Sequence, residues 1–474
     1  MSGVVAAVDL GATSGRVMLG HVGHDELRLV PVARFPNQPV RLPDGLHWDI
    51  LGLYRNVLAG LASALREQPG IRSIAVDSWA VDYALLRQGR MLGNPYHYRD
   101  ERTAAGVDAT HALVGPAELY AANGLQFLPF NTLYQLAADG LAGSLGAADA
   151  MLLVPDLLNF WLTGERRAER TNASTTGLLD VRTSGWDDSL IERLGLPRGI
   201  LPPLASPGAT IGTLLPDVAA ELGATSALQV TAVGSHDTAS AVVAVPAEGD
   251  DFAYISSGTW SLVGVELEHP VLGEASRLAG FTNEGGVDGR IRYLQNVSGL
   301  WLLSESVRTW ERTGEMIDLA TLIREASDVT SAVPVFDAAD ARFTAPGDMP
   351  ARIAAWCTEH GLAAPQTRAE FVRSILESLA EAYAVSLRSL TELTGRRIRV
   401  VHVVGGGSQN SLLCQLTADR TGLPVLAGPV EATAIGNVLV QARTQGLVPR
   451  GSSLEALRAL VSRTFAPERY LPTP

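Results

Sequence analysis

Two copies of one short pattern limit the folds open to this chain: a strand, a turn of glycine and hydroxyl residues, and a second strand. The first copy surrounds the turn Gly11 to Gly15, and the second surrounds the turn Ser257 to Thr259. In both copies the flanking residues are apolar and often β-branched, which is typical of a β-hairpin. A duplicated domain is the simplest explanation of two halves that open alike. We therefore predict two domains, residues 1–244 and residues 245–474.

Helical and strand patterns alternate along the rest of the chain. Apolar spacing predicts a helix over residues 49–66 and then a strand over residues 73–76. Thr367 and Glu370 form a capping box at the start of another long helical pattern, and a strand is predicted over residues 398–404. Alternating elements of this kind predict an α/β layer architecture.

Charge and composition exclude several classes of protein. The 474 residues include 37 basic and 50 acidic side chains, so the net charge of -13 argues against a nucleic-acid partner. Every basic residue among the 37 is arginine. The lack of lysine excludes Schiff-base enzymes, Walker A nucleotide sites and protein kinases, each of which needs a side-chain amine.

The cysteines and the N-terminal residues predict the compartment. Cys357 and Cys414 are the two cysteines, and their spacing fits neither a disulfide framework nor a zinc site. Residues 1–10 lack the basic start of a signal peptide, and no apolar run has the length of a membrane helix. We predict a cytoplasmic protein without a membrane partner.

The two turns and a glycine triplet are candidates for a nucleotide site. Glycines and hydroxyl groups in a turn offer backbone N–H groups to phosphate oxygens, Arg16 adds charge, and Asp9 suits hydrated Mg²⁺. After the strand at 398–404, the triplet Gly405 to Gly407 lets a ligand approach the backbone, and Asn410 lies beside it. Ordinary hairpin turns are the alternative. The candidate nucleotide contacts are Ala12, Thr13, Ser14, Gly15, Arg16, Thr259, Gly405, Gly406 and Asn410.

Asp237 is the candidate general base. It follows a predicted strand at the point where a helix should begin, and an ionised carboxylate there can accept the proton of a sugar hydroxyl during phosphoryl transfer. A plain helix N-cap is the alternative. His236 has two interpretations as well, as a substrate donor or as a structural histidine.

A sugar-binding segment is predicted at the end of the strand over 73–76. Asp77, Trp79 and Asp82 combine an indole with carboxylates, which suits a sugar, although surface residues at a strand end would look the same. Asn296 could exchange hydrogen bonds with the same ligand.

Four of these segments together resemble the FGGY carbohydrate kinases. They are residues 7–16, 235–240, 256–261 and 403–410, and the likeness extends from the first strand to beyond residue 440. The resemblance implies an α/β fold with two actin-like, ribonuclease-H-like domains flanking an active-site cleft. It also implies ATP and Mg²⁺ as cofactors and a small-molecule sugar as substrate.

Residue roles follow from the same resemblance. Asp237 matches the catalytic base, Asp9 the carboxylate near the metal, and His236, Thr238 and Asn296 positions that contact the sugar. Two positions depart from the most similar branch of the family. Ala80 replaces a glycine beside the sugar, and Ser304 replaces a longer glutamine-type side chain near the nucleotide.

We therefore predict an ATP-dependent ketose kinase that acts as a monomer or a homodimer. Two alternatives remain open at this stage: a different ketose as substrate, and an actin-like assembly or sensor protein in which Asp237 orients water.

Overall fold

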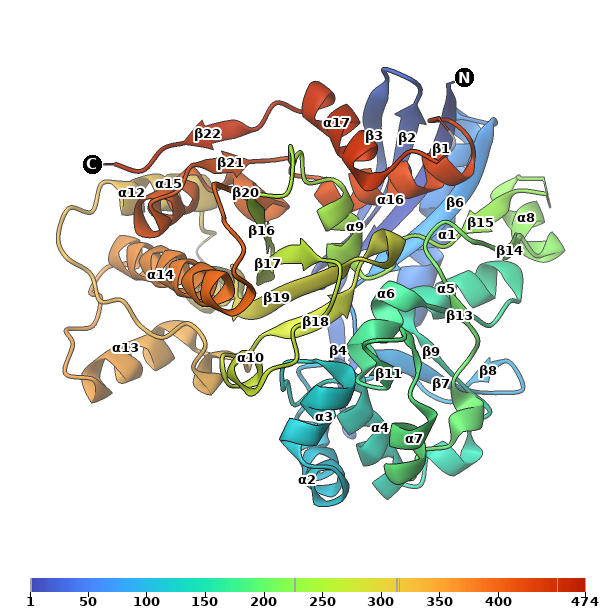
Figure 1. Ribbon diagram of the computed structural model, residues 1–474, viewed down its shortest axis with the longest axis horizontal. Coiled ribbons are helices and arrows are strands. Elements are labelled where there is room, and N and C mark those ends of the chain that lie inside the picture. Colours follow the sequence, from blue (N-terminus) through green and yellow to red (C-terminus); the bar gives the residue numbers. More distant parts are fainter. Residues whose placement is uncertain (1, 226, 313, 315, 450, 474) are drawn as a thin grey trace. The chain divides into compact units, whose positions relative to one another are not determined.

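The computed structural model describes residues 2–225, 227–312, 314, 316–449 and 451–473 (Figure 1). The chain packs into two compact units. Unit 1 comprises Met1–Ala244, Glu266–Tyr293 and Ala432–Thr464, and unit 2 comprises Val245–Val265, Leu294–Glu431 and Phe465–Pro474. Each unit draws on several stretches of the chain, while the predicted division into residues 1–244 and 245–474 stays a prediction.

A six-stranded sheet forms the centre of unit 1, with the strand order β14-β15-β6-β1-β2-β3. Its strands are β1 (Gly3–Leu10), β2 (Ser14–Val22), β3 (Leu27–Pro36), β6 (Ile71–Ser78), β14 (Thr210–Thr213) and β15 (Gln229–Thr231). The first predicted hairpin is confirmed as the antiparallel pair β1 and β2, in which Asp9 lies opposite Arg16. The parallel neighbour of β1 is β6, which ends beyond Asp77.

Shorter strands and most of the helices complete unit 1. The strands are β4 (Pro39–Leu42), β5 (Gly45–Trp48), β7 (Tyr83–Arg87), β8 (Arg90–Met91), β9 (Ala150–Leu153), β10 (Ala168–Glu169), β11 (Leu179–Asp180), β12 (Gly185–Trp186) and β13 (Leu204–Ala205). The helices are α1 (Ile50–Glu67), α2 (Ala104–Leu113), α3 (Pro116–Asn123), α4 (Thr132–Leu141), α5 (Val154–Thr163), α6 (Arg170–Ala173), α7 (Asp188–Arg193), α8 (Pro216–Leu222), α9 (Asp237–Val243), α10 (Glu274–Leu278), α16 (Ala432–Thr444) and α17 (Leu454–Thr464). The helix predicted over residues 49–66 is confirmed as α1.

Helix α16 packs closely on α9 and β2 because glycines stand at the contacts. A Cβ atom added at Gly436 of α16 would lie 1.8 Å from the carbonyl oxygen of Ser240 in α9. A Cβ atom added at Gly20 of β2 would lie 2.4 Å from a methyl group of Val438. Side chains at either position would push the elements apart. This packing holds α9, which begins at Asp237, against the sheet.

A seven-stranded sheet has the order β18-β19-β17-β16-β20-β21-β22. Its strands are β16 (Phe252–Ser257), β17 (Trp260–Leu267), β18 (Thr282–Gly285), β19 (Ile291–Ser298), β20 (Val400–Val404), β21 (Val425–Ala427) and β22 (Glu468–Tyr470). The second predicted hairpin is confirmed as the antiparallel pair β16 and β17, and β16 also pairs in parallel with β20. The combination of sheets and helices confirms the predicted α/β class.

The helices of unit 2 are α11 (Trp301–Glu311), α12 (Leu319–Ser327), α13 (Met349–Glu359), α14 (Arg368–Thr394) and α15 (Ser411–Thr421). The predicted capping box is confirmed at the start of α14, where the Thr367 side chain accepts from the Glu370 N–H and the Glu370 carboxylate accepts from the Thr367 N–H. In the part of the chain that the structure describes, no helix combines the length and apolar character needed to cross a bilayer.

Candidate functional site

Three aspartates lie near one another where the central strands of unit 1 end. Asp9 and Asp77 are register partners on the parallel strands β1 and β6. The next residue of β6, Ser78, forms a β-bridge with His236, which brings Asp237 to the same end of the sheet. The carboxyl ends of parallel strands are the usual position of ligands in open α/β sheets. Asp237, the predicted base, and Asp9, the predicted metal ligand, thus belong to one cluster of aspartates in unit 1.

The surroundings of Asp77 favour its protonated form. It is fully buried, and burial together with the charge of Asp9 raises its pKa well above the ordinary value, although a hydrogen bond from Asn437 opposes the shift. The Asn437 amide nitrogen lies 2.5 Å from the Asp77 carboxyl. The surroundings of Asp77 therefore disfavour a negative charge on it beside the other two aspartates.

Asp9 is paired with the one cation predicted for its turn. The Arg16 Nε donates to the Asp9 carboxylate at 2.9 Å, and the Asp9 side chain is 2% exposed. Within the described residues, no group of three or more His, Cys, Asp or Glu side chains could hold a metal ion. Magnesium is commonly bound through one or two carboxylates, with phosphates and waters completing its shell. Asp9 beside a bound nucleotide therefore fits a magnesium ion, whereas a site made of protein ligands alone does not.

The Asp237 carboxylate does not cap its helix. His236 occupies the N-cap position of α9 and makes no capping hydrogen bond through its side chain, while Asp237 is the first helical residue. The Asp237 side chain is 31% exposed and accepts a hydrogen bond from the Thr238 hydroxyl at 3.1 Å. The N-cap alternative is therefore wrong, and the carboxylate is accessible at the positive end of the helix.

A buried ion pair stands behind His236. The Arg292 guanidinium, which is fully buried, lies 3.0 Å from both the His236 Nδ1 and the Glu284 carboxylate. The other ring nitrogen, Nε2, lies 3.5 Å from the Asp237 carboxylate. Burial acts to raise the pKa of Glu284, but Arg292 and His236 outweigh it and hold that pKa below the ordinary value. The imidazole is therefore anchored on one side and faces Asp237 on the other.

Asp82 accepts hydrogen bonds from four protein groups. One carboxylate oxygen accepts from the indole N–H of Trp48 at 2.6 Å, the indole N–H of Trp79 at 3.1 Å and the backbone of Tyr98 at 3.1 Å. The other oxygen accepts from the Gln135 amide at 3.0 Å. The predicted sugar residue Asp82 is thus engaged with protein donors, which favours a role in orienting the two neighbouring indoles over a direct contact with a ligand.

We expect the fluorescence of Trp48 and Trp79 to report the titration of Asp82. Burial raises the pKa of Asp82 to about 6, in spite of the opposing hydrogen bonds. Because the folded-state pKa exceeds that of an exposed aspartate, about 4, this group favours folding most below pH ~4 and loses that contribution as the pH rises through its folded value. Fluorescence titration of the native protein should show a midpoint near the raised pKa, and Asp82→Asn should abolish it. An unchanged transition in the variant would contradict the assignment.

The backbone next to Asp82 is strained. Val81 has a φ of 67°, a left-handed conformation that β-branched residues rarely adopt. Its carbonyl accepts hydrogen bonds from the Thr132 hydroxyl at 2.7 Å and the Gln135 amide at 3.3 Å. Strain of this kind persists where surrounding contacts enforce it and is common at functional sites. The neighbouring Ala80, the predicted sugar contact, is half-buried.

In the first predicted phosphate turn, the Gly11 N–H binds the Ser14 carbonyl, and Asn37 binds the Gly11 carbonyl through its side chain. Thr13 at the tip is exposed, and Ala12 and Ser14 are half-buried. A Cβ atom added at Gly15 would lie 2.3 Å from the Phe35 ring. Packing alone therefore requires glycine at position 15, whether or not a phosphate binds nearby.

The predicted nucleotide residues of unit 2 surround the second turn. Gly405 has a φ of 83°, and a Cβ atom there would lie 2.9 Å from the Ser257 carbonyl oxygen. A Cβ atom at Gly406 would meet no atom within 4 Å. The Gly258 carbonyl accepts from the Leu300 N–H, and the Thr259 carbonyl from the Trp301 N–H. The triplet thus lies against the turn, with Gly406 facing open space.

The remaining predicted residues of unit 2 differ in their surroundings. The Asn410 side-chain oxygen caps α15 by accepting from the Leu413 N–H, while its buried amide nitrogen lacks a partner among the described residues. Ser304 is exposed on α11, and Asn296 is half-buried on β19.

Three buried residues around the aspartate cluster and His236 were not predicted: Glu284, Arg292 and Asn437. Each is a buried polar residue, with Arg292 and Asn437 fully buried. Buried charged side chains are rare unless they are paired, but the sequence does not show which residues will be buried. A polar residue on the otherwise apolar side of a helix, such as Asn437 in α16, is the one signal that could have been read.

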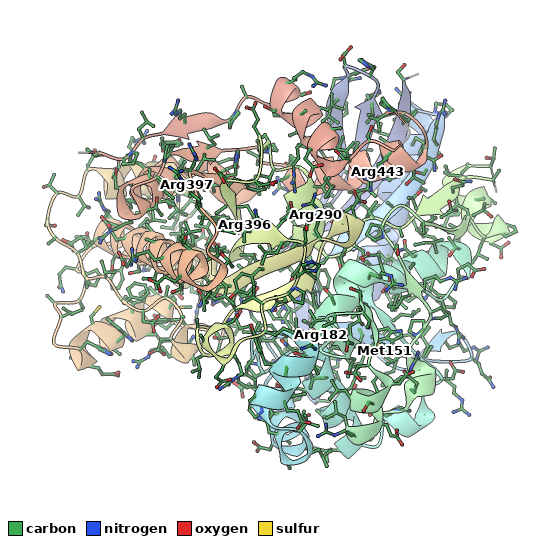
Figure 2. The ribbon with its side chains drawn as sticks, viewed as in Figure 1. Met151, Arg182, Arg290, Arg396, Arg397 and Arg443 are labelled. Carbon is green, nitrogen blue, oxygen red and sulfur yellow. The ribbon has the colours of Figure 1, made fainter. Side chains whose placement is uncertain are left out.

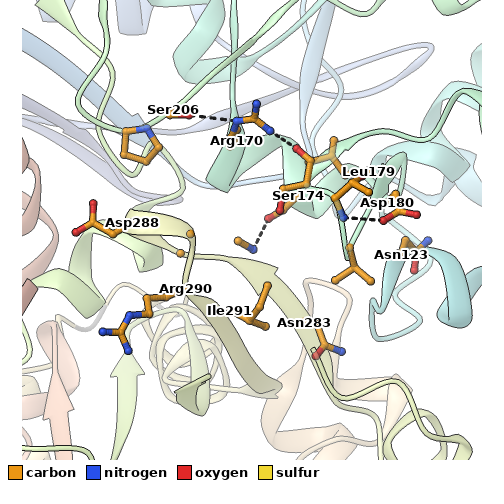
Figure 3. A pocket seen from close by; sticks show the side chains of 17 residues that line it. Asn123, Arg170, Ser174, Leu179, Asp180, Ser206, Asn283, Asp288, Arg290 and Ile291 are labelled. Atoms are coloured by element: carbon orange, nitrogen blue, oxygen red, sulfur yellow. Dashed lines mark hydrogen bonds between the residues drawn. The ribbon is translucent and has the colours of Figure 1, made fainter. Parts of the chain in front are cut away.

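Unit 1 also holds a cavity of about 480 Å³ that none of the predicted site residues lines (Figure 3). Arg170 lies at its wall and donates to the Ser206 hydroxyl. Asp288 also lines the cavity and is paired with Arg443 through two contacts of 2.7 Å. Arg290, another lining residue, is paired with Glu455; Figure 2 labels both arginines. The lining of the cavity includes two aspartates and two arginines, so the charges of its side chains cancel. None of the three aspartates Asp9, Asp77 and Asp237 lines the cavity.

The chain matches a known family over most of its length. Residues 4–244 match the N-terminal domain of the FGGY family of carbohydrate kinases, and residues 253–444 match the C-terminal domain. A rhamnulokinase of Pectobacterium atrosepticum is 42% identical over 473 residues, covering 99% of this chain and 93% of the relative. A rhamnulokinase of Bacteroides thetaiotaomicron is 41% identical over 471 residues, covering 98% and 95%.

Solved structures agree with the fold. A gluconate kinase from Lactobacillus acidophilus has a TM-score of 0.79 at 16% identity, covering 100% of this chain and 94% of its own. A xylulose kinase from Rhodospirillum rubrum has a TM-score of 0.78 at 20% identity, covering 99% and 94%. At such low identity these structures bear on the fold alone, and with the two family domains they confirm the predicted fold class.

Proposed function

This chain belongs to the FGGY family of carbohydrate kinases, and we propose that it transfers the γ-phosphoryl group of ATP to L-rhamnulose. The product is L-rhamnulose 1-phosphate, in the catabolism of L-rhamnose. The observation that carries the proposal is the likeness to rhamnulokinases along nearly the whole chain. As a family member, the chain is an ATP-dependent sugar kinase, so the proposal concerns the identity of the sugar and the roles of individual residues.

Asp237 is the proposed general base. Its carboxylate is partly exposed at the start of α9 and lies beside His236, whose far side is anchored by Arg292. It accepts the proton of the primary hydroxyl as the hydroxyl oxygen attacks the γ-phosphorus. Thr238 donates to the same carboxylate and orients it. The proposed sugar contacts are Trp79, Ala80, Asp82, His236, Asp237, Thr238 and Asn296, with Asp82 acting through the indoles.

The negative charge of the phosphates must be balanced by groups other than lysine, because the chain contains no lysine. Arg16 supplies a cation, and the turns supply backbone N–H groups and hydroxyls. Asp9 would hold a magnesium ion, which would supply positive charge to the phosphates. The proposed nucleotide contacts are Ala12, Thr13, Ser14, Gly15, Arg16, Thr259, Ser304, Gly405, Gly406 and Asn410. We also propose that the enzyme is cytoplasmic and is a monomer or a homodimer.

A panel of ketoses tests the sugar. With ATP and Mg²⁺, we expect kcat/KM for L-rhamnulose to exceed that for L-fuculose and D-xylulose by at least about 100-fold, the discrimination that a few polar contacts provide. A higher value for either competitor would overturn the assignment of the sugar. ADP release that requires no sugar and rises with protein concentration would instead indicate an assembly or sensor protein.

A further inference from the structure

Glu169 contacts the segment that carries the proposed base. It is the last residue of β10, is 1% exposed and stands at the N-cap position of α6. Glutamate is not among the residues preferred at this position, which are Ser, Thr, Asp and Asn. The Glu169 carboxylate caps α6 by accepting from the N–H groups of Thr171 and Asn172. A shorter side chain could cap the helix as well, but Glu169 also reaches beyond it.

That reach extends to Ser235. One Glu169 carboxylate oxygen, Oε2, accepts hydrogen bonds from the Ser235 backbone N–H at 3.0 Å and from the Ser235 hydroxyl at 2.9 Å. The same oxygen accepts from the Thr171 hydroxyl at 2.5 Å, and the other oxygen accepts from the Thr171 N–H at 2.9 Å. Every one of these partners is a donor, so the site requires a group with two accepting oxygens.

Further bonds from the same short helix fix the next residue. The Thr171 hydroxyl oxygen accepts from the His236 N–H at 3.3 Å. The Ser235 carbonyl accepts from the Ser78 N–H at 2.9 Å, which ties the segment to β6. Residues 235 and 236 are therefore held on both sides immediately before Asp237.

We propose that Glu169 is a positioning residue for the reaction, which sets the place of the Asp237 carboxylate by fixing the backbone of Ser235 and His236. This inference rests on the proposed role of Asp237. Displacing a reacting group by about 1 Å can cost on the order of 100-fold in rate. None of the proposed nucleotide contacts lies at residue 235 or 236, so we expect the affinity for ATP to stay unchanged.

Glu169→Gln tests the proposal with little change of shape. An amide has one accepting oxygen, so its NH₂ group must face either the Ser235 donors or the Thr171 N–H. We expect kcat to fall about 10- to 100-fold while the KM for ATP stays within about twofold. A merely structural role would lower the melting temperature and leave the kcat of the folded enzyme unchanged.

Asp156→Asn is the matched control. Asp156 is equally buried, and burial and the charge of Glu169 raise its pKa well above the ordinary value, which favours the protonated form that asparagine resembles. It accepts the Glu169 backbone N–H at 3.2 Å, which an asparagine oxygen can also do. We expect this variant to retain the wild-type kcat.

Ser235→Ala is a second test should Glu169→Gln not fold. It removes the hydroxyl that donates to Glu169 and leaves the carboxylate in place, and we expect kcat to fall several-fold. Wild-type kcat in either variant, with Asp237→Asn inactive, would overturn the role of Glu169 and leave the proposed function intact. Near-normal turnover in Asp237→Asn would overturn the role of Asp237 as base, and the role of Glu169 with it.

Discussion

Asp237→Asn should bind ATP as the wild type does and turn over at least about 1,000-fold more slowly, because a positioned general base contributes on the order of 100- to 10,000-fold. The amide keeps the shape of the side chain and can still accept from the Thr238 hydroxyl, but it cannot take the proton of the sugar. A coupled assay of ADP release measures turnover, and calorimetry with ATP measures binding.

The matched control is Asp217→Asn, which removes an exposed aspartate from the first turn of α8. Both substitutions delete a carboxylate at the start of a short helix, so they lose a similar interaction with the helix dipole. We expect the control to keep full turnover. If Asp237→Asn also keeps it, another group accepts the proton.

The position of Asp237 could be predicted because its signal is local. A strand pattern, a short polar segment and a run of small residues follow one another between residues 229 and 245, and each is a property of neighbouring residues. The two hairpins could be predicted for the same reason, since glycine and hydroxyl residues between apolar β-branched runs specify a turn without help from the rest of the chain.

The partners that give the site its electrostatics could not be predicted in this way. Asn437 reaches Asp77 across 360 positions of sequence, and Arg292 reaches His236 across 56. Such contacts depend on how α16 and β19 pack, and single-sequence periodicity carries no information on that. Asp82 is a second example. Its residue type suggested a sugar contact, but the sequence did not show that its carboxylate accepts hydrogen bonds from Trp48, Trp79, Tyr98 and Gln135.

Removing the buried cation beside His236 should have the largest effect on stability. In Arg292→Met, the carboxylate of Glu284 would be left buried without its cation, and breaking a buried pair in this way costs about 3–5 kcal/mol. Urea unfolding measures the loss. Adding Glu284→Gln removes the uncompensated charge, so the double variant should regain at least about half of the lost free energy, which a double-mutant cycle would report as coupling.

The pH dependence and an exposed control separate this effect from a simple loss of packing. Because the folded state holds the pKa of Glu284 below 4.5, the ionised carboxylate contributes stability above that pH, and the contribution is lost as the pH falls through the lowered value. The difference between wild type and Arg292→Met should therefore be largest near pH 7 and shrink in acid, where Glu284 is neutral in both. Arg290→Met removes a partly exposed arginine whose partner is Glu455, and such a pair is worth at most about 1 kcal/mol. A cost for Arg292→Met that is as small as this, or that does not change with pH, would show that the buried pair contributes little to stability.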